Sequence, residues 1–439
     1  MKITHFSNSF ILIESKGRVM CCDPWVGRAN YGGWHSFPEF NKKKLISHLE
    51  NVDLVYISHI HDDHFDSQFL IESGLVNKKF IVKNFTFKTL YNRLKSIGVV
   101  DIQELEQYTK FSFGGLVMSI LPQISSNSDT LDEDVEYDLD TSLVISDGTH
   151  TFFNQVDNPY STVDYVFIKD WINSNYGDIT IAALMAGAAS EYPHTFLNIN
   201  RLAERSRVIN NSLKKLVDKL DILKPNYYFP AGGTYIIPGK LHALNSLIAQ
   251  PSNSQIIDCL NQTNLGVNFL QLEGGKSVEI TSNSLGFKVA NEILPTCLDN
   301  LKSIDNHKND LYDYEQDVIE IQIDTLKDLF ETAATNWKNV LIKKEICVEQ
   351  DISFILHKEL NLSQDFNFIL GEPIGHFELS SNLEESEGRL KIHIDYRSFY
   401  LCLTRKKVWN GTLGALCLFE REPNIFYPSV TFSLNYLAV

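Results

Sequence analysis

The stretch Asp53-Leu-Val-Tyr-Ile-Ser-His-Ile-His-Asp-Asp-His-Phe-Asp66 carries the strongest signal in the chain. It opens with a short apolar run, residues 54–57, whose β-branched and aromatic side chains predict a buried strand. Four metal-binding side chains follow at the end of that strand: His59, His61, Asp63 and His64. Imidazole and carboxylate groups are ligands of zinc and iron, so one loop could hold one or two ions. We interpret the stretch as a metal site, or the remnant of one, rather than as surface histidines.

Length and charge limit the classes of protein to consider. The chain has 439 residues, which is longer than a domain with a single hydrophobic core usually is. Its composition turns polar over residues 275–310. We therefore predict two domains, residues 1–290 and 300–439. The formal net charge of −16 argues against nucleic acid or an anionic membrane surface as a partner.

The amino-terminal residues and the cysteines bear on localisation. No apolar segment opens the chain and no apolar run approaches membrane-spanning length, which predicts a soluble cytoplasmic protein without a membrane span. The seven cysteines are scattered and odd in number, as expected for reduced thiols. Because no Cys-X-His is followed by Cys-X-X-His, we do not expect a Rieske iron–sulfur cluster within this chain.

The apolar pattern also predicts the other elements. In the first domain we expect strands at residues 3–13, 18–22, 79–82, 141–146, 151–156 and 227–229, and helices at 41–50, 85–97 and 201–223. In the second domain we expect one amphipathic helix over residues 314–340 and strands over 389–404 and 412–420. Helices and strands together predict an α+β architecture there.

A second carboxylate follows another predicted strand. Asp157 comes directly after the run 151–156, just as the histidines follow residues 54–57. Strand ends of a layered α/β fold meet at one edge, so we predict that Asp157 is a metal ligand. The acidic run between Pro122 and Asp140 is typical of a solvated loop.

Three further residues are candidates for substrate binding. Trp34 ends the Gly-rich aromatic loop of residues 30–34, which could line the mouth of a pocket or simply pack as a turn. Arg201 and Arg205 begin a basic helix, where they could contact an anionic substrate. The later lysines of that helix fit a solvated face better.

Taken together, these motifs resemble the metallo-β-lactamase fold and, within that superfamily, CMP-N-acetylneuraminate hydroxylase and its bacterial relatives. The similarity spans residues 3 to about 250 and is weaker over residues 393–437. It rests on six motifs: Cys22-Asp-Pro-Trp25, Gly33-Trp34, Tyr56-Ile-Ser-His-Ile-His-Asp-Asp-His64, Asn154-Gln-Val-Asp157, Gly187-Ala-Ala-Ser190 and Pro230-Ala-Gly-Gly233. The resemblance implies an α/β fold, the αββα sandwich, with a metal site at the edge where its two sheets meet. A C-terminal α+β appendage would follow.

The resemblance also implies a ligand set. His59, His61, Asp63 and His64 would bind the metal, and Asp157 would bridge two ions. The family pattern has a histidine between Pro122 and Asp140, where this chain has none; the substitutes we considered are Asp129, Asp132 and Asp134. Asn8 stands where the hydroxylase-like pattern has histidine, and His242 and His194 are candidates for a late ligand. One or two divalent ions, iron or zinc, are expected.

Three functions stay open at this point. An iron oxygenase would hydroxylate a small-molecule N-acyl sugar nucleotide such as CMP-N-acetylneuraminate, and would need a separate ferredoxin or cytochrome as electron donor. A hydrolase would activate water for attack on an ester, lactone or phosphodiester, with Asp63 orienting the water or passing protons as the catalytic residue. A non-catalytic binding protein with a degenerate metal site is the third.

Overall fold

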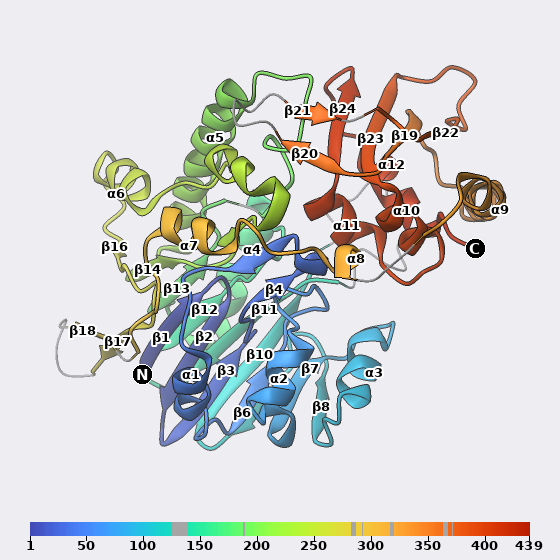
Figure 1. Cartoon of the computed structure of the whole chain (residues 1–439). Helices are drawn as coiled ribbons and strands as arrows, with labels where there is room; N and C mark the ends of the chain where they lie inside the picture. Colours follow the sequence, from blue (N-terminus) through green and yellow to red (C-terminus); the bar gives the residue numbers. More distant parts are fainter. Residues whose placement is uncertain are drawn as a thin grey trace.

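The computed structural model describes residues 1–124, 139–187, 189–281, 287–291, 293–316, 320–362, 368–370 and 372–439. Two large sheets lie face to face in the first part of the chain, with helices on their outer faces (Figure 1). The last part, coloured orange and red in Figure 1, forms a smaller body above one edge of the two sheets. The αββα sandwich with a C-terminal α+β appendage is therefore confirmed.

The first sheet has eight strands among the described residues. In spatial order they are β18 (Phe287–Asn291), β17 (Lys276–Ile280), β1 (Lys2–Ser7), β2 (Phe10–Ser15), β3 (Arg18–Cys22), β6 (Leu54–Tyr56), β7 (Lys79–Lys83) and β8 (Ile102–Leu105). The prediction of one strand over residues 3–13 is wrong. The chain turns back at Asn8, whose φ of 44° allows the tight connection between β1 and β2.

The second sheet has seven strands in the described part of the chain. In order they are β16 (Asn268–Phe269), β14 (Tyr227–Pro230), β13 (Ile181–Leu184), β12 (Thr151–Asn154), β11 (Thr141–Ser146), β10 (Leu116–Pro122) and β9 (Phe111–Phe113). A small third sheet comprises β15 (Tyr235–Ile236), β5 (Trp34–Ser36) and β4 (Arg28–Ala29).

Both large sheets contain a parallel half. The neighbours β3, β6, β7 and β8 run parallel in the first sheet, as do β12, β13, β14 and β16 in the second. Since parallel strands all end at the same edge, the loops after β3, β6 and β12 share one rim of the sandwich.

Successive side chains of each strand point to opposite faces of its sheet, and this separates the buried residues into layers. In β6, Leu54 and Tyr56 face the layer between the sheets, whereas Val55 faces the helices outside. On that outer face pack α1 (Lys42–His48), α2 (Ser67–Glu72) and α3 (Thr89–Ser96). The other outer face is covered by α4 (Thr162–Tyr176), α5 (Arg201–Leu223) and α6 (Asn253–Asn261). The predicted helix over residues 201–223 matches α5 at both ends.

The appendage has its own sheet and core. Its four-stranded sheet is β22 (Gly375–Leu379), β19 (Asp351–His357), β23 (Arg389–Asp395) and β24 (Leu418–Glu422), beside the pair β20 (Leu360–Leu362) and β21 (Phe368–Leu370). The helices of this half of the chain are α7 (Asn300–His307), α8 (Asp313–Gln316), α9 (Ile323–Lys344), α10 (Tyr396–Leu403), α11 (Trp409–Leu416) and α12 (Pro428–Ser433). Trp337 of α9 and Phe354 of β19 belong to one buried cluster.

Three predictions for the appendage are corrected. The single helix over residues 314–340 is wrong, because residues 320–322 are not helical and α9 begins only at Ile323. The strand over 389–404 ends at Asp395, whose side chain accepts a hydrogen bond from the Arg397 N–H and thereby caps α10. The segment 412–420 is the end of α11 followed by β24.

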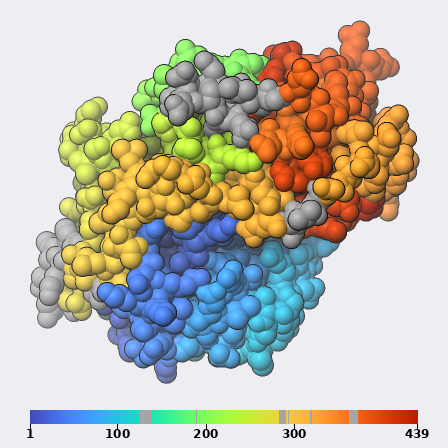
Figure 2. All heavy atoms as spheres, in the orientation of Figure 1, coloured from blue at the N-terminus to red at the C-terminus, as the bar shows by residue number. Residues whose placement is uncertain are grey.

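An apolar contact joins the two parts. Trp34 stacks on Tyr235, with ring centroids 4.2 Å apart, and both belong to a buried cluster that includes Ala415 and Leu416 of α11. Figure 2 shows the orange and red surface directly against the blue surface of the sandwich. The helix α7 contacts β15 of the first part, and the boundary between residues 290 and 300 stays a prediction. None of the described helices is long and apolar enough to cross a membrane.

Candidate metal centre

Loops after three parallel strands bring the candidate ligands to one rim. Asp23 follows β3, the histidine loop (residues 58–66) follows β6, and Asp157 follows β12 closely. The backbone is left-handed at Asp23 (φ 41°) and at Val156 (φ 56°), which is unusual for a β-branched residue. Such conformations persist where the surrounding structure fixes them, as at functional sites.

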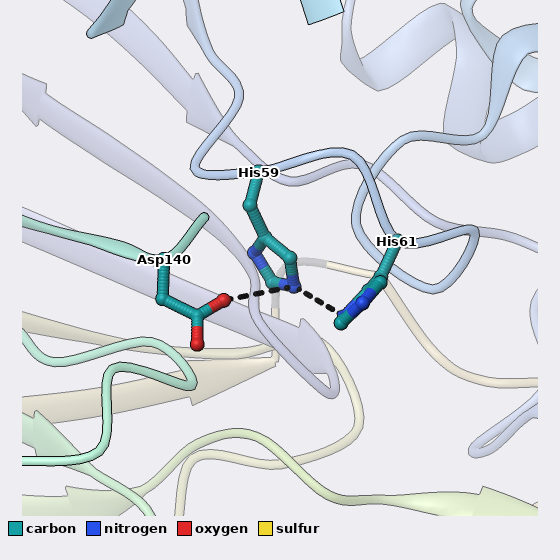
Figure 3. A group of neighbouring side chains, drawn as sticks. All are labelled: His59, His61 and Asp140. Atoms are coloured by element: carbon teal, nitrogen blue, oxygen red, sulfur yellow. Dashed lines mark hydrogen bonds and ion pairs between the residues drawn. The ribbon is translucent and has the colours of Figure 1, made fainter. Parts of the chain in front are cut away.

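One group of ligands combines His59, His61 and Asp140 (Figure 3). His59 Nε2 lies 2.9 Å from His61 Nδ1 and 3.6 Å from Asp140 Oδ1. The next residue fixes Asp140, because the Thr141 hydroxyl donates to the Ser58 carbonyl at 2.7 Å and is bonded to the Tyr56 hydroxyl at 2.6 Å. These bonds tie the start of β11 to the end of β6.

The second group combines His59, His64 and Asp157. His64 Nε2 lies 3.2 Å from Asp157 Oδ2 and 3.5 Å from Asp63 Oδ2. Asp63 is buried, and its Oδ2 accepts a hydrogen bond from Asn8 Nδ2 at 3.3 Å. We call His59, His61 and Asp140 the outer group, and His59, His64 and Asp157 the inner group.

Each histidine turns one ring nitrogen inward and the other to a partner. His59 Nδ1 faces Ser58 Oγ at 2.9 Å, and that hydroxyl in turn donates to Asp23 Oδ2 at 2.7 Å. His64 Nδ1 donates to the same carboxylate at 3.0 Å. His61 Nε2 meets the Asn410 side chain of α11 at 3.0 Å. Partners of this kind fix the tautomer and ring orientation of metal-ligating histidines.

Burial and charge set the protonation of the inward atoms. Burial lowers the pKa of His59 well below its ordinary value, and the neighbouring His64 and His61 lower it further, so His59 offers a free lone pair. Burial would also lower the pKa of His64, but Asp157 and Asp63 outweigh it and raise that pKa well above its ordinary value. The carboxylates beside His64 therefore favour a positive charge at that position, whereas His59 stays neutral.

Asn8 connects three parts of the rim. Its side chain donates to the backbone carbonyl of Asp63 at 3.1 Å and accepts from the Thr234 N–H at 3.3 Å, while its carbonyl accepts from the Gly232 N–H at 3.0 Å. Although it replaces the expected histidine, it is a positioning residue for Asp63. Gly232 has a φ of 92°, and a Cβ there would lie 3.2 Å from Asp157 Oδ1, so glycine suits this close approach.

Asp140 is the ligand candidate that the sequence did not single out. It was one of several acids in a run that reads as a solvated loop, and its position before a strand was the signal that could have found it. The substitutes considered from sequence, Asp129, Asp132 and Asp134, lie outside the described residues. From the sequence, Asp23 is only one residue of the motif Cys22-Asp-Pro-Trp25, with no role of its own.

His242 and His194 are in neither group. His242 lies on η4 (Gly239–Leu247), a 3₁₀ rather than an α-helix, where its Nδ1 bonds to the Gly239 carbonyl at 2.8 Å. His194 is 1% exposed, and burial, with the nearby Arg201 charge, lowers its pKa to about 3.

The predicted substrate contacts have structural surroundings of their own. Trp34 is 7% exposed inside the interdomain contact. Arg205 Nε donates to the Ile248 carbonyl at 2.9 Å. Arg201 stands at the first position of α5, and burial lowers its pKa. Substrate binding by these three residues stays a prediction.

The donor set fits a divalent cation. Asp157 Oδ1 is a buried oxygen with no hydrogen-bond partner among the described residues, and such an atom is costly unless a cation satisfies it. Neutral imidazoles and carboxylates are suitable donors for zinc and for iron. The outer group would hold one ion. Because the inward nitrogen of His59 has one lone pair and serves one ion, the other members of the inner group, His64 and Asp157, would hold a second ion together with Asp63.

The comparisons with known proteins agree with this architecture. Residues 2–131 match the family model for the β-lactamase superfamily domain. The match agrees with the two-sheet topology of the first part of the chain, which is that of the metallo-β-lactamase fold.

Individual curated proteins are similar to this chain at lower levels of sequence identity, and over only part of their length. The chain is 28% identical to a Mycolicibacterium smegmatis protein named as a Rieske 2Fe-2S iron–sulfur protein, over 54% of this chain and 43% of that one. It is 25% identical to cytidine monophosphate-N-acetylneuraminic acid hydroxylase of Asterias rubens, over 60% of this chain and 38% of the relative. The chain thus spans about two fifths of the length of the curated relatives it matches.

Two solved structures are also similar. CmlA, a diiron β-hydroxylase from Streptomyces venezuelae, aligns at 15% identity with a TM-score of 0.41, over 66% of this chain and 54% of that one. An isothiocyanate hydrolase from Delia radicum gut bacteria aligns at 14% identity with a TM-score of 0.44, over 64% of this chain and 100% of the other.

Proposed function

We propose that this chain is a metal-dependent oxygenase that holds one or two iron ions at the rim of the sandwich. The observation that carries the proposal is the composition of the outer group, whose two histidines and one carboxylate place their ligand atoms within 4.8 Å of one another. Two histidines and a carboxylate are typical of non-haem iron(II) oxygenases. Asp140 provides a carboxylate where the resembled family has a histidine, and this harder oxygen donor favours iron over a purely imidazole-bound zinc.

The proposed substrate is an N-acyl sugar nucleotide such as CMP-N-acetylneuraminate, because the relatives include hydroxylases named for that compound. Iron, when bound, would supply the redox chemistry that activates oxygen. One oxygen atom would enter a C–H bond and the other would leave as water, which consumes two electrons and two protons. A separate ferredoxin or cytochrome is the proposed electron donor.

The residues of the chain would do the remaining work. His59, His61, His64, Asp63, Asp140 and Asp157 would hold the ions. Asp63 is buried, and although burial would raise its pKa, His64 outweighs that effect and the pKa lies below its usual value. An ionised Asp63 fixed by Asn8 would accept a proton close to the metal. Arg201 and Arg205 are the proposed contacts of the anionic part of the substrate, and Trp34 that of its ring.

The proposal can be tested by metal analysis and turnover. Full-length protein purified without oxygen should contain iron and, with CMP-N-acetylneuraminate and a chemical reductant, should consume oxygen and yield a product heavier by one oxygen atom. His59→Ala should abolish both the iron content and the oxygen consumption. Iron-loaded protein that consumes no oxygen with this substrate would contradict the substrate, and protein that takes up only zinc would contradict the oxygenase.

Hydrolysis is the second candidate, because the ionised Asp63 beside His64 is equally suited to orient a water molecule for attack. This function needs no electron donor. Zinc-loaded protein that turns over an ester, lactone or phosphodiester, and loses that activity in Asp63→Asn, would support it. Protein that binds neither metal would instead support a binding protein with a degenerate site.

A further inference from the structure

A side chain of the appendage lies beside one of the candidate metal ligands. Asn410, the second residue of α11, lies 3.0 Å from His61 Nε2. The two residues are 349 positions apart in the chain. We propose that Asn410 is a positioning residue of the outer metal group, so that the C-terminal domain completes the metal centre. The inference rests on the proposed function, because it assigns a role toward the metal that His61 would bind.

The orientation of the His61 ring supports this role. Its Nδ1 faces His59 Nε2 at 2.9 Å and is therefore the inward atom. A neutral imidazole carries one N–H, so when Nδ1 binds a cation the hydrogen must be on Nε2. That N–H points at Asn410. The Asn410 atom that lies 3.0 Å from Nε2 is the amide nitrogen Nδ2. The two ends of an asparagine amide are assigned from their hydrogen bonds, and a half-turn of this amide places its carbonyl oxygen there to accept from Nε2.

The other two histidines show the same arrangement. His59 has Ser58 behind its outward nitrogen, and His64 has Asp23. With Asn410, every histidine of the two groups has an orienting partner. Two of these partners come from strand ends of the sandwich, whereas the third comes from α11. Without the C-terminal domain, His61 would keep its inward contact but lose the partner that fixes its ring.

The contact is held by a well-anchored helix. Just before α11, the backbone N–H of Val408 donates to the Tyr31 hydroxyl at 2.7 Å. Within the helix, the buried Trp409 Nε1 donates to the Leu437 carbonyl at 2.9 Å. The helix also lies close to the loop before β5, since a Cβ on Gly33 would be 2.5 Å from Ala415 Cβ. The residues before and after Asn410 are therefore held in place, which keeps its exposed side chain within reach of His61.

The variants Asn410→Ala and Asn410→Asp test the inference in the full chain. Alanine removes the acceptor, whereas aspartate retains an oxygen at the same reach. The matched control is Asn424→Ala, an exposed asparagine of the same domain whose amide contacts the Tyr192 hydroxyl. Cobalt(II) is the probe, because competition with a chelating dye gives its affinity and its visible spectrum reports the ligand geometry.

We expect Asn410→Ala to weaken cobalt binding at one site by roughly 10-fold or more and to alter the spectrum, as is typical of lost partners of metal-ligating histidines. Asn410→Asp should stay close to the unaltered protein, and Asn424→Ala should match it. Thermal unfolding shows that each variant is folded. Unchanged affinity and spectrum in Asn410→Ala would overturn the inference while leaving the metal centre intact. Failure of the unaltered protein to bind cobalt would overturn the metal centre itself, and this inference with it.

Discussion

His64 and His61 lie three residues apart in one loop, yet their orienting partners come from opposite ends of the chain. The partner of His64 is Asp23, which is fully buried and follows a neighbouring strand of the same sheet. The partner of His61 is Asn410, an exposed side chain of the appendage. The orienting partner of His64 in the inner group comes from the sandwich itself. The orienting partner of His61 in the outer group is present only when the appendage packs against the sandwich.

The two partners also differ in how much their loss should cost in free energy of unfolding. Burial raises the pKa of Asp23, but His64 and Ser58 oppose that effect, and the pair is enclosed by protein. Removing one member of such a buried pair is costly, because the other keeps its desolvation penalty. A hydrogen bond at the surface competes with water and contributes less. Changes on the His64 side should therefore disturb stability and metal binding together, and changes on the His61 side mainly metal binding.

The largest effect is expected for His59→Ala, because His59 belongs to both groups. Its loss removes a ligand of the outer ion, so metal affinity there should fall by more than the roughly 100-fold typical of changes in a supporting partner. Metal content after dialysis measures the effect. His376→Ala, which alters an exposed histidine of β22, is the matched control and should retain its metal. A His59→Ala protein with full metal content would refute both groups.

Asp140→Ala should separate the two sides. The outer group would lose its carboxylate while His64, Asp63 and Asp157 are untouched, so we expect one fewer ion per chain. Asp140→His, which restores the histidine of the resembled family, should keep the ion. Titration with cobalt(II) gives the stoichiometry of each. If Asp140→Ala binds as many ions as the unaltered protein, Asp140 is not a ligand.

Asp140 also shows how far the sequence could lead. The loop after β6 and the carboxylate after β12 were predictable, because parallel strand ends share an edge whatever the details of packing. The choice of Asp140 was not, since it depends on the bonds of Thr141 to Ser58 and Tyr56 across two sheets.

The contact of Asn410 with His61 was equally beyond the sequence. It depends on how two domains dock, which no local pattern encodes. The correction over residues 389–420 has a more local cause. Apolar runs of four to eight residues suit a strand or a buried helix equally, and the Asp395 cap marks the point where the predicted strand over 389–404 gives way to α10.

Asp23→Ala should weaken the inner side without removing a ligand. His64 Nδ1 and both donors of Ser58 would lose their acceptor, so we expect roughly 10- to 100-fold weaker binding of one ion. We also expect a loss of about 3–5 kcal/mol in the free energy of unfolding, as for a broken buried pair. Urea denaturation measures the second effect. Asp23→Asn, which keeps one acceptor oxygen, should fall between; equal stability of all three proteins would contradict this account.

Tyr31→Phe is the mildest change, since it removes only the acceptor of the Val408 N–H and leaves Asn410 in place. The lost bond is worth about 1 kcal/mol, which corresponds to roughly a fivefold loosening of the contact between α11 and the loop. Cobalt(II) affinity of the outer group should fall by no more than that factor, and the inner group should be unaffected. Tyr427→Phe, which removes the hydroxyl contact to Glu387 in the appendage and away from α11, is the control.

The decisive comparison is a double-mutant cycle, because Tyr31 acts on the metal only by holding Asn410 at His61. In an Asn410→Ala background, Tyr31→Phe should therefore cause no further loss of affinity, and the coupling energy should equal the effect of Tyr31→Phe alone. Additive losses would mean that the Asn30–Gly32 turn reaches the outer group by another route. In that case the loop before β5 would support the outer group independently of Asn410.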